Sequence, residues 1–269
     1  MCELLAMSSL HPAQLTFSLQ VLANHGNPAG RTRDGWGAAF YQGNDVALFR
    51  EPAAAGDSAL VRYLESQGPR TTLAISHIRR ATHGAVTLAN TQPFQRTWAG
   101  RAHVFAHNGD LPDIGRWAPL VFSHGGPVGT TDSEHAFCRL LQCIGALWAS
   151  PDVIPSVTHR LEVIVQFAAE LRERGPANFL YADGETLFVH GDRRIQADGK
   201  IAPPGLFVLS RLCQYAGETV GGNGVRVGAG FQEVSLVASV PLTAEDWRPL
   251  ARGEVLAITS EKVVGAGKA

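Results

Sequence analysis

Hydrophobic residues recur at helical spacing in three parts of the chain. From His11 to Gly26 the leucines share one face, and the glycine suits a helix stop. The TDSE segment at 131–134 has the spacing of a capping box, and apolar residues follow it at helical intervals as far as Trp148. A further amphipathic stretch runs from Val157 to Arg174. These patterns predict three helices.

Apolar runs with polar ends predict strands in the rest of the chain. Arg33 to Tyr41 is a turn running into a strand, and Thr71 to Arg79 and Arg101 to Gly109 are buried strands with polar tips. NFLYADGETLFVHG predicts a hairpin turning at Asp183-Gly184, and GLFVLS, SLVASVPL and EVLAITSEKVV predict further strands. Helices and strands mix without regular βαβ alternation, which favours an α+β layered fold.

Composition narrows the class of protein. The 269 residues are 45% hydrophobic and 17% charged, which fits a globular chain of one large domain or two small ones. A formal net charge of −1 predicts no nucleic-acid or membrane partner. The first thirty residues contain no Lys or Arg and no long apolar run, so we expect no secretory signal. The four cysteines form no CxxC pair, and we expect a reducing cytoplasm.

Cys2 has two interpretations. It is either a small apolar residue of an N-terminal strand or a nucleophile. Removal of Met1 would place a thiol and a free α-amine on one residue, and because that amine titrates near ~8 it could act as a base toward its own side chain.

Polar residues collect at three strand or helix ends, and each cluster has a structural and a functional interpretation. SHIRRATHG covers 76–84, AHNGD covers 106–110 and GTTDSE covers 129–134. Asn108-Gly109 alone is typical of a type I′ hairpin turn, and Thr131 and Glu134 alone would only cap a helix. Arg79 and Arg80 could be a strand end in solvent. The histidines at 77, 83, 103 and 107 match no common zinc spacing, so no metal is predicted, and GGNG at 221–224 predicts a loop.

In their order along the chain, MCELLAMS, DGWG, HIRRATHG, AHNG and TDSE resemble the motifs of class II glutamine amidotransferases, which are N-terminal-nucleophile hydrolases. The similarity covers most of the chain and is greatest to the stand-alone YafJ-like subgroup. It implies a four-layer αββα sandwich and one glutamine amidotransferase domain over residues 2–269, with Met1 removed. The chain departs from the family at Ala6, where glycine is frequent, and at Arg80, where larger synthases often have an aromatic residue.

The resemblance also implies a role for each motif residue. Cys2 would be the nucleophile and its freed amine the base. The amide of Asn108 and the backbone N–H of Gly109 would form the oxyanion hole. Arg79 would bind the α-carboxylate of glutamine, because a guanidinium grips a carboxylate at two points, and Asp132 would pair with the α-ammonium. The pocket would be shaped by three further residues, Thr82, His83 and Gly84.

The implied activity is cleavage of the γ-amide of glutamine, or of a γ-glutamyl compound, through a thioester on Cys2, with no cofactor. The alternative is a non-catalytic or partner-dependent glutamine-binding subunit. Because no synthase domain is visible in the chain, ammonia would be released to water or passed to a separate synthase-like partner.

Overall fold

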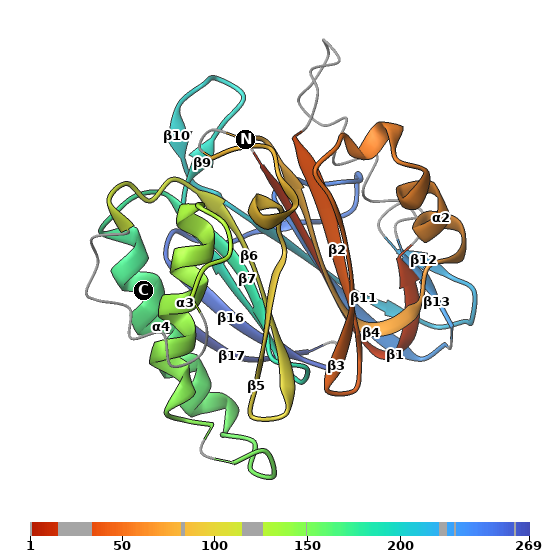
Figure 1. The fold of residues 1–269 in the computed structure, drawn as a ribbon. Helices are drawn as coiled ribbons and strands as arrows, with labels where there is room; N and C mark the ends of the chain where they lie inside the picture. Colours follow the sequence, from red (N-terminus) through yellow and green to blue (C-terminus); the bar gives the residue numbers. More distant parts are fainter. Residues whose placement is uncertain are drawn as a thin grey trace.

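The computed structural model describes residues 2–15, 34–81, 84–114, 126–148, 150–220, 225–228, 230–260 and 262–269. The first sheet contains β1 (Glu3–Leu15), β2 (Gly35–Gln42), β3 (Asp45–Glu51), β4 (Arg70–Arg79), β11 (Phe207–Cys213), β12 (Thr219–Val220), β13 (Val225–Val227), β14 (Gln232–Ala238) and β15 (Arg248–Pro249). Its order is β15-β11-β14-β1-β4-β2-β3, and β13 pairs with β1 and β12. Strand β1 therefore lies inside the sheet, between β4 and β14 (Figure 1).

The second sheet contains β5 (Phe94–Trp98), β6 (Arg101–Gly109), β7 (Ala177–Ala182), β8 (Leu187–Gly191), β16 (Glu254–Thr259) and β17 (Lys262–Lys268). Its order is β17-β16-β8-β7-β6-β5, and every pair is antiparallel. A separate two-strand hairpin consists of β9 (Arg194–Ile195) and β10 (Ile201–Ala202). The described helices are α2 (Ala59–Gln67), α3 (Asp132–Gly145) and α4 (Val157–Arg172), with short 3-10 turns at Ala55–Asp57 and Leu88–Asn90.

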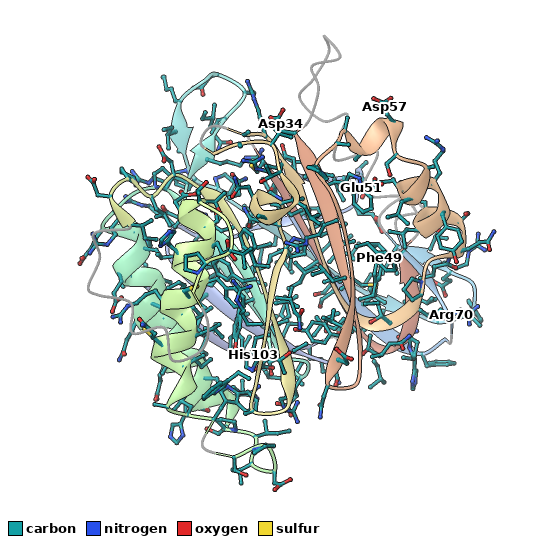
Figure 2. The ribbon with its side chains drawn as sticks, viewed as in Figure 1. Asp34, Phe49, Glu51, Asp57, Arg70 and His103 are labelled. Carbon is teal, nitrogen blue, oxygen red and sulfur yellow. The ribbon has the colours of Figure 1, made fainter. Side chains whose placement is uncertain are left out.

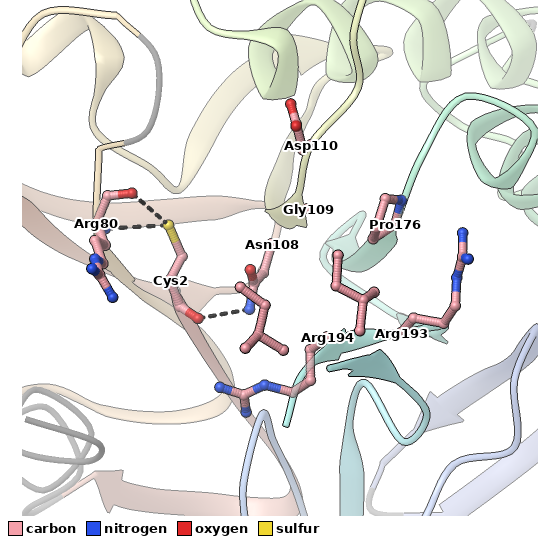
Figure 3. A pocket seen from close by; sticks show the side chains of 10 residues that line it. Cys2, Arg80, Asn108, Gly109, Asp110, Pro176, Arg193 and Arg194 are labelled. Carbon is pink, nitrogen blue, oxygen red and sulfur yellow. Dashed lines mark hydrogen bonds between the residues drawn. The ribbon is translucent and has the colours of Figure 1, made fainter. Parts of the chain in front are cut away.

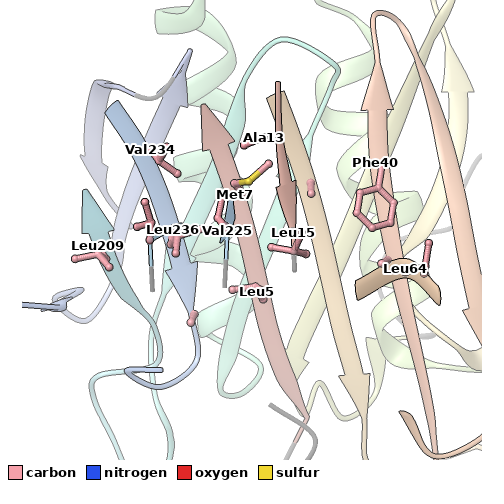
Figure 4. Close-up of a cluster of buried hydrophobic side chains, with 14 of the residues drawn as sticks. Leu5, Met7, Ala13, Leu15, Phe40, Leu64, Leu209, Val225, Val234 and Leu236 are labelled. Atoms are coloured by element: carbon pink, nitrogen blue, oxygen red, sulfur yellow. The ribbon is translucent and has the colours of Figure 1, made fainter. Parts of the chain in front are cut away.

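Period-two alternation along the strands produces three apolar layers. Leu4 of β1 faces the other sheet, where it joins Val104 and Leu180. Leu5 and the other odd-numbered apolar residues of β1 face away from the second sheet and pack with Leu64 of α2 (Figure 4). On the outer face of the second sheet, aromatic side chains of β6, β7 and β8 pack against α3 and α4. The result is the predicted αββα order of layers, filled with side chains throughout (Figure 2).

Most predicted elements are confirmed, and one is wrong. The hairpin at Asp183-Gly184 joins β7 to β8, and α3 and α4 occupy the predicted segments, with α4 ending two residues early at Arg172. The helix predicted from His11 to Gly26 is wrong where the structure describes it, because β1 continues to Leu15. There Ala13 pairs with both β4 and β13 and is fully buried, so sheet pairing outweighs the helical spacing. Residues 16–26 lie outside the described residues.

Candidate functional site

Cys2 directly precedes β1, so the pairing of β1 with β4 and β14 fixes its position. Its Sγ accepts a hydrogen bond from the Arg80 backbone N–H at 3.2 Å and lies 3.4 Å from the Arg80 carbonyl oxygen. The residue is half-buried. Burial raises the pKa of the Cys2 thiol above its ordinary value of 9.0, outweighing the opposing effect of the Arg80 hydrogen bond. The thiol is therefore protonated at neutral pH, and an attack from it requires a base.

Asn108 and Gly109 meet Cys2 at the end of β6. Both residues pair with β7, Asn108 opposite Asn178 and Gly109 opposite Ala177, so the hairpin-turn interpretation is wrong. The Asn108 Nδ2 donates a hydrogen bond to the Cys2 carbonyl oxygen at 2.6 Å, across 106 positions of sequence. Asn178 Nδ2 in turn donates to the Asn108 carbonyl oxygen at 3.1 Å. The side-chain amide predicted to form an oxyanion hole is thus held beside the predicted nucleophile.

Position 109 has no room for a side chain, because neighbouring atoms lie too close to its backbone. A Cβ there would lie 1.9 Å from the Pro176 carbonyl oxygen and 2.6 Å from His107 Nε2. A side chain would therefore push the end of β6 away from the chain that precedes β7. Glycine keeps the backbone of this strand end close to its neighbour.

A pocket of about 190 Å³ opens beside these residues (Figure 3). One end is formed by Cys2, Asn108 and Gly109, which are the predicted catalytic residues. The pocket then extends to the β9–β10 hairpin, and its further lining residues are Arg80, Asp110, Pro176, Arg193, Arg194, Ile195 and Ile201. The structure therefore brings the three predicted catalytic residues to one concave surface.

Arg79 ends β4 and is buried, so it is not the solvated strand end of the structural interpretation. Its guanidinium donates to the carbonyl oxygens of Gly84 and Ala85, both at 3.3 Å. Gly84 has φ +74°, a conformation that favours glycine. Thr82 and His83 lie outside the described residues. Asp34, which is labelled in Figure 2, lies just before β2. It accepts a hydrogen bond from the Ala81 N–H at 2.7 Å and so anchors the strand end that carries Arg79.

Asp132 is the first residue of α3. Its Oδ1 accepts from the Ser133 N–H at 2.8 Å and its Oδ2 from the Leu111 N–H at 3.0 Å, which ties the helix start to the segment after β6. Thr131 caps the helix as predicted, accepting from the Glu134 N–H. Among the described residues, the lining of the Cys2 pocket includes Cys2, Asn108 and Gly109 but not Arg79, Gly84 or Asp132.

Glu134 lies in the first turn of α3, and its carboxylate forms hydrogen bonds outside the helix. It accepts from the N–H groups of Val128 and Gly129 and pairs with Arg96 at 2.5 Å. Glu134 thus anchors the segment before α3 to β5.

Several buried polar residues that support the site were not predicted. Glu3, next to Cys2, is buried and accepts from Arg194 Nη2 with both carboxylate oxygens at 3.0 Å. The Gln92 side chain forms two hydrogen bonds with the backbone of His107, the residue before Asn108. It accepts from the His107 N–H at 2.6 Å and donates to the His107 carbonyl oxygen at 3.1 Å. No local pattern distinguishes these residues from surface polar residues, because their partners lie far away in the sequence.

Two buried histidines lie next to the site strands. The pKa of His77 on β4 is lowered to about 3, by burial first and then by the charges of His107 and Arg79. Burial also lowers the pKa of His107 on β6, whose Nδ1 lies 3.0 Å from Ser133 Oγ. Both rings are therefore neutral at physiological pH. The other cysteines, at 138, 143 and 213, also have thiol pKa values raised by burial.

The described residues show neither a metal cluster nor a membrane-spanning helix. No group of three or more His, Cys, Asp or Glu side chains among them is placed to hold a metal ion. No helix in the described part of the chain is long and apolar enough to cross a bilayer.

Comparisons with known proteins indicate the family of the chain. A family model described as "Glutamine amidotransferases class-II" matches residues 1–269. The chain is 31% identical to "Putative glutamine amidotransferase YafJ" of Escherichia coli (strain K12), over 94% of this chain and 96% of that protein.

Solved structures give the same result. A predicted glutamine amidotransferase from Pseudomonas aeruginosa PA01 superposes with a TM-score of 0.69 at 31% identity, covering 98% of this chain and 100% of that one. The glutamine phosphoribosylpyrophosphate amidotransferase of B. subtilis shares the fold, with a TM-score of 0.59 at 16% identity over 99% of this chain and 49% of that one. The predicted sandwich of the N-terminal-nucleophile type is thereby confirmed. The chain belongs to the class II glutamine amidotransferases, a family that hydrolyses the side-chain amide of glutamine or transfers its nitrogen.

Proposed function

We propose that the protein hydrolyses the γ-amide of glutamine, or of a γ-glutamyl compound, through a thioester on Cys2. The observation that carries this proposal is the contact between the Asn108 amide and the Cys2 carbonyl at 2.6 Å, at the mouth of a pocket. It supports the proposal because the Cys2 thiol and a hydrogen-bond donor lie together at a pocket that a substrate carbonyl could enter.

The base in this mechanism is the α-amine of Cys2, freed when Met1 is removed. In the described residues, both hydrogen bonds of Sγ are with the Arg80 backbone, which offers no proton acceptor of suitable pKa. The raised pKa of the thiol makes a base necessary. An α-amine on the same residue meets that need without a histidine.

The thiol attacks the γ-carbonyl carbon, and negative charge develops on its oxygen. The Asn108 Nδ2 and the Gly109 N–H stabilise that charge, while the thiol proton passes to the departing nitrogen. Water then hydrolyses the thioester, releasing glutamate and restoring the thiol. We assign the α-carboxylate of the substrate to Arg79 and the α-ammonium to Asp132, with Thr82, His83 and Gly84 shaping that end of the site.

The proposal includes one domain over residues 2–269, simple hydrolysis rather than ammonia transfer to a synthase-like partner, and a cytoplasmic location. The described cysteines are all free thiols, which suits a reducing compartment.

The test combines mass spectrometry with steady-state kinetics. Intact-mass measurement should find the chain shortened by Met1. A γ-glutamyl electrophile should then label Cys2 alone, because Cys138 and Cys213 are buried and Cys143 lies on α3, away from the pocket. Cys2→Ser should abolish ammonia release, whereas the matched control Cys143→Ser should retain it. Labelling at another cysteine with Cys2 untouched, or full activity in Cys2→Ser, would overturn the proposal.

A further inference from the structure

The pocket beside Cys2 is larger than the leaving group of glutamine requires. Ammonia has the size of water, for which a cavity of roughly 10–15 Å³ is enough, whereas this pocket has a volume of about 190 Å³. The residues assigned to the glutamyl half, Arg79 and Asp132, are not among the described lining residues. A γ-glutamyl amide extends in both directions from its reacting carbon. The pocket is therefore free for the amine half.

We propose that this pocket binds the amine half of γ-glutamyl amino acids with an aliphatic side chain. The inference rests on the proposed function and names its substrate class. It is carried by two kinds of lining residue, one aliphatic and one cationic.

The aliphatic part is a pair on the β9–β10 hairpin. Ile195 and Ile201 are directly opposite each other in the strand register, and both line the pocket. They are 47% and 54% exposed, so a bound aliphatic side chain would remove apolar surface of both partners from water. Pro176 extends the apolar lining. An ammonia molecule could use none of these contacts.

The cationic part is Arg193. Its Nε lies 3.5 Å from Asp192 Oδ2, but the same carboxylate also pairs with Arg172 at 3.4 Å and Arg252 at 3.2 Å. Three guanidinium groups thus share one buried carboxylate, so Asp192 only partly neutralises Arg193, the one of the three that lines the pocket. Figure 3 shows Arg193 across Asn108 from Cys2. The α-carboxylate of an amino-acid leaving group is the matching anion.

The other charged lining residues are compatible with a substrate whose leaving-group carboxylate lies at Arg193. Arg194 is already engaged by Glu3 and by the Ser239 carbonyl oxygen. Asp110 directly follows Gly109, so it lies at the reaction end of the pocket, where the departing nitrogen becomes a cationic amine. Arg80 is the third arginine of the lining and lies beside the nucleophile.

The hairpin that carries the isoleucines is held in place. The Gln196 side chain donates to the carbonyl oxygens of Ala202 and Pro204 at 2.5 and 3.1 Å, and its N–H donates to the Lys200 carbonyl at 2.8 Å. Arg194 fastens the hairpin to Glu3, one residue from the nucleophile. The apolar pair therefore has a fixed position relative to Cys2, as a specificity pocket requires.

In the proposed reaction, a bond forms between Sγ and the γ-carbon, and the bond from that carbon to the amino-acid nitrogen breaks. The thiol proton ends on the departing amine, which leaves as a free amino acid. Water then supplies hydroxide to the acyl group and a proton to sulfur, giving glutamate. No oxidant or cofactor is needed.

The test compares kcat/KM for γ-glutamyl-leucine, γ-glutamyl-glycine, γ-glutamyl-leucinamide and glutamine. We expect the leucine compound to exceed the glycine compound at least tenfold, a typical effect of an aliphatic group in an apolar pocket, and to exceed its uncharged amide severalfold. The double variant Ile195→Ala/Ile201→Ala should remove most of the leucine-to-glycine preference. Arg193→Gln should remove the preference for the free carboxylate. Lys200→Ala, on the exposed end of the same hairpin, is the matched control and should change neither ratio.

The outcomes separate the two proposals. Glutaminase activity without a leucine preference, or a preference that survives the isoleucine variants, overturns the inference and leaves the proposed function standing. If no γ-glutamyl compound is hydrolysed, the proposed function fails, and calorimetry on Cys2→Ala decides the inference. Binding of γ-glutamyl-leucine at least tenfold tighter than γ-glutamyl-glycine supports it, and equal binding overturns it.

Discussion

The buried histidine of β4 makes folding stability depend on pH. His77 lies opposite Leu4 in the strand register and is fully buried. Among the described residues, neither of its ring nitrogens has a hydrogen-bond partner. Its pKa falls from 6.5 to about 3 because burial disfavours the charged ring, with smaller contributions from His107 and Arg79. The folded protein therefore keeps this ring neutral where the unfolded chain protonates it.

The sign and size follow from this difference. Below pH 6.5 the unfolded chain binds a proton at His77 and the folded protein does not, so acidification favours unfolding until the pH approaches 3. Each pH unit in this window costs about 1.4 kcal/mol, so between pH 6.5 and 5 the loss is about 2 kcal/mol. His190, whose pKa is lowered to about 4, adds a similar loss. Together they remove roughly 4 kcal/mol, a large part of the 5–15 kcal/mol typical of a domain.

Urea denaturation at pH 7 and pH 5 measures this effect above the range in which most carboxylates titrate. His77→Leu should lose about 2 kcal/mol less than the wild type over that interval. His159→Gln, at an exposed position of α4, is the control and should follow the wild-type curve. Equal losses in His77→Leu and wild type would refute the argument from burial.

Four further predictions concern the site. Asn108→Ala should lower kcat for ammonia release by roughly 10²–10³ with the far-UV circular dichroism unchanged, and full activity would remove this residue from the oxyanion hole. Arg79→Ala and Asp132→Ala should each raise KM strongly, since loss of one partner of a desolvated charge pair costs about 2–5 kcal/mol, and an unchanged KM would contradict their assignment. Thr131→Ala should lower the free energy of unfolding by about 1 kcal/mol in urea, because it removes the N-cap of α3. In protein that retains Met1, alkylation of Cys2 by iodoacetamide should accelerate through and above pH 9, because burial raises its thiol pKa, and a plateau below pH 8 would refute that shift.

The parts of the fold that follow from local pattern could be predicted from the sequence. The apolar run with a polar tip from Arg101 to Gly109 predicts β6, and the Thr131 cap followed by apolar residues predicts α3. The amidotransferase motifs then indicated which strand ends belong together. The position of Arg79 at a buried strand end is consistent with that reading.

Other parts depend on contacts between distant residues. Glu3 and Arg194 are 191 positions apart, and nothing near either residue indicates a buried pair. Leu15 fits a helical spacing, yet it belongs to β1. The two residues before it pair with β4 on one side and β13 on the other, and these partners are far away in the sequence. The β9–β10 hairpin carries the pocket's apolar wall, but its strands have 2 residues each and are too short to show a strand pattern.

The interior position of β1 has a consequence for how the protein loses activity. Residues near a chain end usually fray and exchange their amide hydrogens early. Here the backbone pairs with β4 from Glu3 onward and with β14 from Leu5 onward. The amides of Glu3 to Ser8 should therefore be among the slowest to exchange, opening only with the whole domain. Inactivation by denaturant should accordingly coincide with global unfolding, with no earlier step in which the nucleophile alone is released.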